Sequence, residues 1–361
     1  MRPSFIRNRR EIELPGPHRS ATGEVFGYPA YFSVVTGLSR LKMIHLRLPP
    51  GTRTNAPGAY RDEEEFFFVL EGTPDLWVDG NLYRLREGDG VAFNDGTGIA
   101  HTLINNTDRD VRLFVFGEAT RMFSQFACPL PDDAPTNALL RKQGKLWLDP
   151  PKRKLGPNGG KPGDRSGAKR GRPAFVHNWR AILEKDEGGY PNSLELHGID
   201  AKFGRRAGFS RVGIHFEILP PGRRTSWPHV EGDEEEFVYV VSGALDVWLD
   251  GRIVTCGEGD FIGWETSRGV THVCINNSDK DTLLLVGGEA SRQRSRVWYP
   301  LHPHRDKETG ENFWRDHPGV KLGPHDGLPD AMRARLPKAA RKNAIIANRA
   351  AMKLKPETVR A

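Results

Sequence analysis

The residues best suited to chemistry gather in one acidic stretch, PHVEGDEEEFVYVVSG, at residues 228–243. It contains His229 and Glu231, followed by a run of carboxylates that ends at Glu236, where a strand-like apolar segment begins. Crowded carboxylates repel one another unless water or a cation offsets their charge. Imidazole and carboxylate together suit Fe, Mn, Zn, Ni or Co, and no soft thiolate is implied. The stretch is therefore either a solvated acidic loop or half of a metal site.

A second block, residues 258–279, adds another histidine, His272. Alternate residues of a strand point the same way, so His229 and Glu231 could face one ion together. Glu236 opens the next strand-like segment. His272 lies on a distant segment, which only a closed barrel would bring near the others.

The chain contains an internal repeat. Residues 48–80 align with 219–251 at an offset of 171 without a gap, and 18 of the 33 positions are identical. The same offset pairs 87–108 with 258–279. Further matches, at slightly different offsets, are FIRN (5–8) with FVHN (175–178) and KLGPNGGKP (154–162) with KLGPHDGLP (321–329). One module is therefore used twice.

Each module is predicted to be all-β. Short segments such as FFFVL and DVWLDG are rich in β-branched and aromatic residues, and Gly, Asp and Asn interrupt them at regular intervals. The exception is an Ala-rich segment, 338–353, that favours a helix. The expected organisation is an N-terminal barrel at 1–150, a basic flexible linker at 151–173, a C-terminal barrel at 174–330 and a basic, short helical tail at 331–361.

Composition and charge narrow the class of protein. The net charge of +7 arises from the segments 151–173 (+7) and 331–361 (+8), so the remainder carries −8. Basic tracts without interleaved aromatics are weak evidence for nucleic-acid binding, which is not expected. The sequence shows no apolar run of membrane-spanning length and no apolar core of a signal peptide near its start. Three scattered cysteines fit a reducing compartment, so a cytoplasmic location is expected.

The spacing of His229, Glu231, Glu236 and Gly243, followed by Gly259, Asp260, Gly269, His272 and Asn276, resembles the two motifs of the cupin superfamily. The resemblance covers the core of both modules, so the chain resembles a bicupin, and its flanking sequences are similar to poorly characterised single-cupin proteins. It implies two tandem double-stranded β-helices of the jelly-roll kind. It also implies one divalent metal ion, Fe, Mn, Zn or Ni, inside a barrel.

Carried onto this sequence, the resemblance assigns His229, Glu231, Glu236 and His272 as metal ligands. Cupins commonly use three histidines and one glutamate, whereas Glu231 stands here where the second histidine is usual. Glu231 is then either a fourth ligand or, if it is not coordinated, a catalytic general base. The motif's proline is also replaced, by Ser267.

The first module departs further from the pattern. The four matching positions hold Gly58, Tyr60, Glu65 and His101. Glycine offers no ligand and tyrosine is an uncommon one, so this barrel is expected to be metal-free, with a role in packing or in shaping a pocket.

Two functions from different classes follow. The first is a metal-dependent enzyme, dioxygenase-like or a decarboxylase or isomerase, acting on a small oxygen-rich or aromatic acid. The second is a non-catalytic module that binds a small ligand or serves a structural role. Arg211, Arg223 and Arg224 are the candidates for clamping a substrate carboxylate. The resemblance to cupins makes a homo-oligomer one expected assembly, and pairing of the two modules within one chain is the alternative. A small molecule is the main expected partner.

Overall fold

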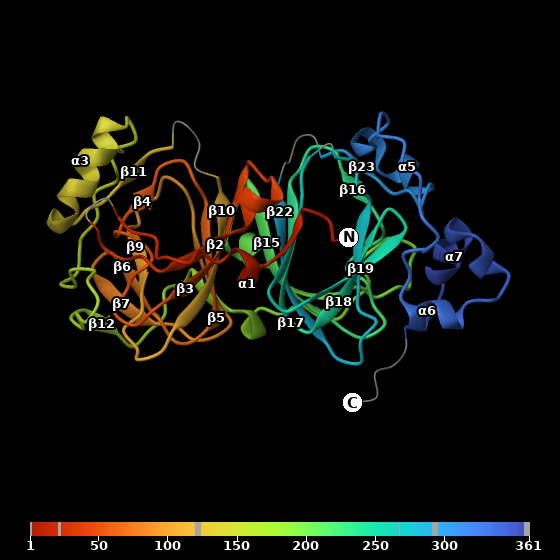
Figure 1. Ribbon diagram of the computed structural model, residues 1–361, viewed down its shortest axis with the longest axis horizontal. Coiled ribbons are helices and arrows are strands. Elements are labelled where there is room, and N and C mark those ends of the chain that lie inside the picture. The colour runs from red at the N-terminus through yellow and green to blue at the C-terminus, as the bar shows by residue number, and fades with distance from the viewer. Residues whose placement is uncertain (1, 21–22, 120–123, 267, 291–294, 357–361) are drawn as a thin grey trace. The chain divides into compact units, whose positions relative to one another are not determined.

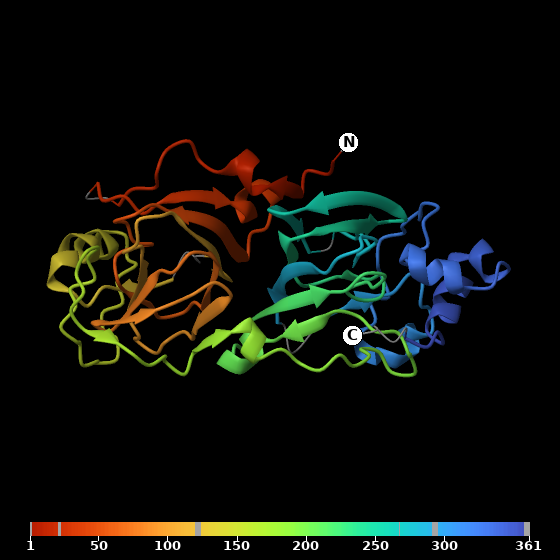
Figure 2. The ribbon, with the colours of Figure 1, turned by 90° about the horizontal axis from the view of Figure 1, so that it is seen from below.

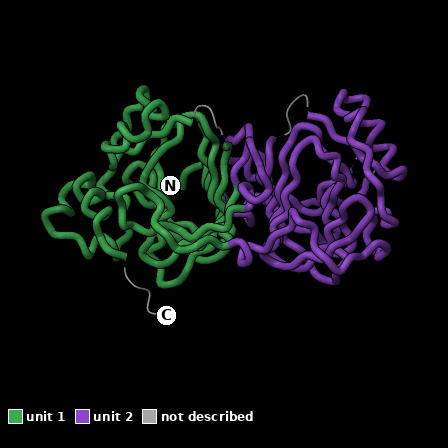
Figure 3. The backbone as a smooth tube through the Cα atoms, turned by 180° about the vertical axis from the view of Figure 1, so that it is seen from behind, with its two compact units in different colours: residues 1–6, 183–202, 214–361 green, residues 7–182, 203–213 purple. Residues whose placement is uncertain are grey.

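The computed structural model describes all residues except 1, 21–22, 120–123, 267, 291–294 and 357–361. The chain divides into two compact units (Figures 1 and 3). Unit 2 comprises Arg7–Ile182 and Phe203–Gly213 and contains the barrel of the first module, here the first barrel. Unit 1 comprises Met1–Ile6, Leu183–Lys202 and Ile214–Ala361 and contains the second barrel. Both barrels are of the jelly-roll type, as the sequence predicted.

The first barrel is built from two main sheets and a short ribbon. The larger sheet has the order β13 (Val176–Asn178), β8 (Asp89–Phe93), β5 (Glu65–Glu71), β10 (Val111–Glu118), β3 (Leu41–Leu48) and β2 (Tyr28–Tyr31). The smaller sheet has the order β12 (Ala168–Lys169), β7 (Asn81–Arg84), β6 (Asp75–Val78) and β9 (His101–Ile104), and the ribbon pairs β11 (Phe126–Ala127) with β4 (Ala59–Tyr60). Apolar side chains from both sheets fill the interior between them.

The second barrel repeats this plan (Figure 2). Its larger sheet has the order β1 (Ile6–Asn8), β20 (Asp260–Trp264), β17 (Glu236–Ser242), β22 (Thr282–Glu289), β15 (Val212–Leu219) and β14 (Ile199–Ala201). The smaller sheet has the order β19 (Arg252–Gly257), β18 (Ala244–Leu249) and β21 (His272–Ile275), and the ribbon pairs β16 (Val230–Glu231) with β23 (Val297–Trp298).

Helices are few and short. The α-helices are α1 (Arg9–Ile12), α2 (Phe32–Thr36), α3 (Ala134–Lys142), α4 (Phe203–Ala207), α5 (Arg305–Glu308), α6 (Asp330–Arg335) and α7 (Ala344–Ala351). The short helical tail was predicted. It begins later than the Ala-rich composition suggested, because Asn343 adopts an extended backbone and caps α7 by accepting a hydrogen bond from the Ile346 amide. Among the described residues, the longest helices are too short to cross a membrane.

The first strand of each module lies with the other module's barrel. β13 pairs with β8, where the Asn178 side chain also donates to Asp89, and this segment belongs to unit 2. Conversely, Met1–Ile6 belong to unit 1, where the Gly263 amide donates to the Phe5 carbonyl at 3.0 Å. The repeated segments FIRN (5–8) and FVHN (175–178) contain the two exchanged strands, β1 and β13. The units are therefore discontinuous in sequence, in contrast to the contiguous domains at 1–150 and 174–330 that the sequence led us to expect.

Residues 154–162 and 321–329, here the KLGP segments, each pack against a tryptophan of one barrel. In the first barrel the Trp77 indole N–H donates to the Asn158 carbonyl at 3.0 Å, and in the second the Trp248 indole donates to the His325 carbonyl at 2.8 Å. Carbonyl oxygens of a docked segment thus satisfy the buried N–H groups of two fully buried tryptophans.

Residues 151–173 were expected to be a flexible linker, but they make defined contacts with the first barrel. Arg165 pairs with Asp75 at 3.0 Å, and Arg172 pairs with the fully buried Asp89 at 2.7 Å. The positive charge of this segment is therefore partly matched by barrel carboxylates, which charge counting along the sequence does not reveal.

Candidate metal centre

Backbone pairing places two histidines side by side in the second barrel. His229, just before β16, and His272, the first residue of β21, exchange both of their backbone hydrogen bonds, at 3.1 and 2.8 Å. Residues paired in this way project their side chains to the same face. Their ring centroids lie 4.8 Å apart. Glu236 opens β17, and its cross-strand partner Trp264 stacks on the His272 ring at 3.9 Å.

Both imidazoles are held in the orientation that a metal ligand needs. Nδ1 of His229 lies 2.8 Å from the Trp227 carbonyl, and Nδ1 of His272 lies 3.0 Å from the Val270 carbonyl. A backbone carbonyl accepts only from a protonated nitrogen, so Nδ1 carries a hydrogen and Nε2 is the nitrogen that can bind a metal ion once it is unprotonated. Both Nε2 atoms then face Glu236, at 3.9 Å from Oε1 for His229 and 3.3 Å from Oε2 for His272.

The three residues fit one divalent cation. One ligand atom each from His229, Glu236 and His272 lies within 4.8 Å of the others. Glu236 Oε2 is buried, and no described residue gives it a properly aligned hydrogen bond. A carboxylate oxygen in that state costs free energy, which an ion would offset. Two imidazoles and one carboxylate suit Mn, Fe, Zn or Ni.

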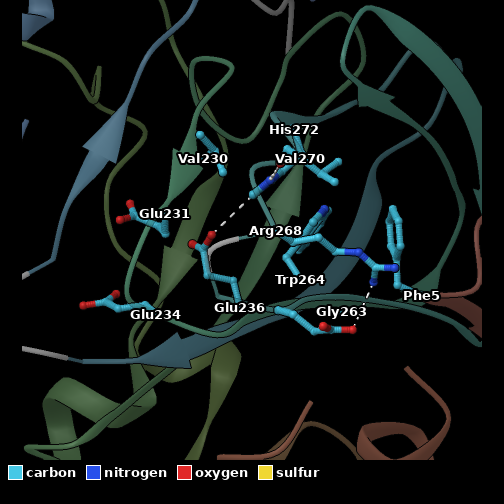
Figure 4. Close-up of a pocket in the computed structure, with 11 residues that line it drawn as sticks. Phe5, Val230, Glu231, Glu234, Glu236, Gly263, Trp264, Arg268, Val270 and His272 are labelled. Carbon is cyan, nitrogen blue, oxygen red and sulfur yellow. Dashed lines mark hydrogen bonds and ion pairs between the residues drawn. The ribbon is translucent and has the colours of Figure 1, made fainter. Parts of the chain in front are cut away.

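Glu231 lies outside this group. Among the described residues, the cluster within 4.8 Å does not include it, and its Oε2 accepts from the Ser295 hydroxyl at 3.1 Å. Figure 4 shows the Glu231 carboxylate turned away from Glu236 on the wall of a pocket. Burial and the neighbouring Glu236 charge raise the pKa of Glu231 to about 8. The geometry therefore favours an uncoordinated Glu231 over a fourth ligand. The general-base role, which requires the carboxyl to lose its proton first, stays a prediction.

A small pocket opens beside the three ligands (Figure 4). Its volume is about 10 Å³, so it accepts only a very small molecule in this conformation. Trp264 lines it, and the buried Trp264 indole nitrogen has no hydrogen-bond partner among the described residues. Arg268 lines it as well, pairing with Glu265 at 3.0 Å, with its guanidinium above the Phe5 ring.

The arginines proposed from the sequence lie elsewhere. Arg211 is in unit 2, where it pairs with Glu118 at 2.7 Å. Arg223 pairs with Asp186, and Arg224 pairs with Glu195. The arginine at the pocket is Arg268, which sequence reasoning missed. The available signal was its place in the second block, four residues before His272.

Sequence reasoning also missed a second ionisable group in unit 1. One ligand atom each from Asp200, His215 and Glu217 lies within 4.8 Å of the others. His215 and Glu217 alternate along β15, at positions where the first module has Ile44 and Leu46. A signal for this group was present in the sequence. Two aliphatic residues of the first module, two positions apart in a buried strand, are matched by ionisable residues in the second.

In the first barrel the same framework carries different chemistry. Gly58 and His101 form the matching backbone bridge. The space next to Gly58 is filled, because a Cβ there would lie 2.1 Å from Cζ of Phe126. The matching positions in the second barrel are His229 and Val297, so a large and a small side chain have exchanged places.

A built-in cation also lies beside the first barrel's glutamate. Lys42 Nζ is 3.0 Å from Glu65 Oε1, and His101 Nε2 is 3.3 Å from Glu65 Oε2. Burial disfavours the charge on Lys42, but Glu65 and Glu63 outweigh this effect and raise the pKa of Lys42. Lys42 holds the pKa of Glu65 at about 2, against the opposing effect of burial. These contacts support the expectation that this barrel is metal-free.

Comparison with known proteins agrees with this duplicated geometry. The cupin domain family matches the chain twice, at residues 44–117 and 215–287. The chain is a bicupin. Each match spans the strands that carry the residues discussed above. No curated protein matches the bicupin significantly by sequence.

Solved structures similar to the bicupin include oxalate decarboxylases. The Lactobacillus farciminis enzyme in complex with formate is 15% identical with a TM-score of 0.50, covering 83% of this chain and 90% of that one. An oxalate decarboxylase structure concerned with substrate binding and reaction specificity is also 15% identical with a TM-score of 0.50, covering 82% and 79%. At this level of identity the likeness establishes the fold alone.

Proposed function

We propose that the bicupin is an enzyme that binds one divalent metal ion through His229, Glu236 and His272 and acts on a small carboxylic acid. The observation that carries this proposal is the convergence of two imidazole Nε2 atoms on one buried carboxylate, with both Nδ1 atoms fixed by backbone carbonyls. A bound metal supplies Lewis-acid polarisation of a chelated substrate oxygen.

The pocket indicates the substrate class. Arg268 lines it and offers a cation that can pair with a substrate carboxylate. The unpartnered Trp264 indole N–H can donate to a second substrate oxygen. These features favour a small acid rich in oxygen. A decarboxylase-type reaction fits such a substrate, and the fold shared with oxalate decarboxylases supports this choice over a dioxygenase.

Glu231 is assigned the proton-transfer role in this proposal. It lines the pocket and is not among the three grouped ligands. Its carboxyl can exchange a proton with the reacting carbon or oxygen of a substrate held by Arg268. The Ser295 hydroxyl, which donates to Glu231, positions the side chain.

The test is the metal content of the chain purified without added metal, measured by mass spectrometry. We expect about one divalent ion per chain, and its loss in His272→Ala. The matched control is His101→Ala, which removes the corresponding histidine of the first barrel and should leave the metal content unchanged. A further control is His215→Ala, which disrupts the group of Asp200, His215 and Glu217. If the ion is bound at the proposed centre, this variant should keep its metal content.

The reaction class is tested with the metal-loaded protein. Carbon dioxide release from small dicarboxylic and 2-oxo acids, at constant dissolved oxygen, would support decarboxylation. Oxygen consumption in step with substrate loss would favour a dioxygenase instead. One bound metal without turnover of any such acid would favour the non-catalytic alternative, and no metal in wild-type protein would contradict the proposal.

A further inference from the structure

The first barrel contains a larger cavity than the metal centre does. Its volume is about 240 Å³, against about 10 Å³ beside His272. An apolar cavity of about 150 Å³ is enough to hold benzene. The cavity therefore has room for a ring with substituents, and all the residues that line it belong to unit 2.

One end of this cavity is polar. Lys42, Tyr60 and Glu65 line it there, and the ammonium of Lys42 lies 5.1 Å from the centre of the Tyr60 ring. Lys42 lines the cavity, and its side chain is 18% exposed. An ammonium has three N–H donors. The described carboxylates within 4 Å of Nζ are those of Glu65 and Glu63, which leaves one donor for a ligand.

Much of the remaining wall is apolar, and it differs from the second barrel. Ile44, Leu46, Phe67 and Val115 contribute aliphatic and aromatic surface. In the second module the positions of Lys42, Ile44 and Leu46 are held by Gly213, His215 and Glu217. Along this strand the first barrel therefore has Lys42 where the second barrel has a glycine, and aliphatic residues where the second barrel has His215 and Glu217.

The cavity is unfilled, although a barrel with a purely structural role would be expected to fill it with side chains. Next to Gly58, the Phe126 ring occupies the space that a histidine takes in the second barrel. No such filling has occurred between Lys42 and Leu46, where larger aliphatic residues would raise stability through burial. A bound small molecule would account for the unfilled volume of this cavity.

Charge selects the kind of occupant. The Lys42 ammonium is already balanced by the Glu65 carboxylate at 3.0 Å. A carboxylate ligand would add a third carboxylate beside Glu65 and Glu63 in a poorly solvated site, which is costly. A neutral oxygen can accept from the ammonium without this penalty.

We propose that this cavity binds a small uncharged organic molecule, with an apolar ring against Ile44, Leu46 and Phe67 and a hydroxyl or carbonyl oxygen that accepts from Lys42. The first barrel is then a second, metal-independent ligand site. This inference does not depend on the proposed enzymatic function of the second barrel.

Binding of benzyl alcohol and of benzoate to the full chain, followed by ligand-detected NMR titration, tests this inference. We expect benzyl alcohol to bind at least about tenfold more tightly than benzoate. Leu46→Trp, which fills the cavity, should abolish binding, and Lys42→Met should weaken it. The matched control is Glu217→Leu, at the corresponding position of the second barrel, which should leave binding unchanged.

Each outcome decides the proposal. Loss of benzyl alcohol binding in Leu46→Trp, with retention in Glu217→Leu, supports it. If Leu46→Trp does not fold, weakened binding in a folded Lys42→Met variant supports it in the same way. Three results would overturn the proposal. These are unchanged binding in both first-barrel variants, tighter binding of benzoate than of benzyl alcohol, and no binding of benzyl alcohol to folded protein.

Discussion

Replacing Arg224 by methionine is expected to lower the free energy of unfolding by about 3–5 kcal/mol. The Arg224 and Glu195 side chains are both 0% exposed, and the guanidinium binds the carboxylate through two hydrogen bonds of 2.6 and 2.9 Å. The guanidinium also donates to the Gly327 carbonyl and to the Asn348 side chain. Among the described residues, methionine would leave the buried carboxylate with the Trp227 indole as its one remaining side-chain donor. Chemical denaturation in urea measures the loss.

The repeat supplies a matched control for Arg224. Arg53 occupies the corresponding position and pairs with Glu24 at 2.7 Å, but the Glu24 side chain is 29% exposed. Arg53 also contacts the buried Asp133, but at the longer distance of 3.5 Å. Water can solvate Glu24 after Arg53→Met, so the loss there should be smaller. The double variant Arg224→Met with Glu195→Gln should recover part of the stability, because no unpaired charge remains. A loss below about 1 kcal/mol in Arg224→Met would show that the pair is dispensable.

These arginines also show how much of the fold the sequence repeat reveals. The offset of 171 identified Arg53 and Arg224 as equivalent, and the separate KLGP echo marked Gly160 and Gly327. In the folded chain each arginine donates to the glycine carbonyl of its own KLGP segment. Sequence comparison found both halves of this contact but could not join them, since pairing between distant segments is a property of the folded barrel.

The candidate ligands were predictable because strand alternation and motif spacing determine which residues face inward. His229, Glu236 and His272 meet as expected. Glu231 does not join them, because the direction of a side chain at the end of a two-residue strand depends on its local partner, here Ser295. The exchanged first strands could not be foreseen either. The match of FIRN to FVHN shows that two segments are equivalent, not which barrel each one joins.

Lys42 is the residue whose importance was hardest to predict. Its counterpart is Gly213, and it lies just outside the most strongly matching block, 48–80. A lysine that pairs with the glutamate of a barrel has no motif of its own. It becomes visible only when its distance to Glu65 is known.

The contrast between the barrels predicts that a metal site can be built in the first one. We expect the triple variant Lys42→Gly, Gly58→His, Phe126→Val to bind a divalent ion at residues 58, 65 and 101. The three changes reproduce Gly213, His229 and Val297 of the second barrel. They remove the competing ammonium, add an imidazole and clear the ring that a Cβ at position 58 would strike.

The variant is best made in the His272→Ala background, where the proposed centre of the second barrel is disabled. Metal content should then rise from near zero to about one ion per chain. Gly58→His alone is the control: it should gain no metal and should lower the melting temperature, because Phe126 and Lys42 remain. A folded triple variant that binds no metal would show that removing Lys42 and Phe126 is not enough to create a metal site in the first barrel. The difference between the barrels would then lie in the surrounding walls, where Ile44 and Leu46 replace His215 and Glu217.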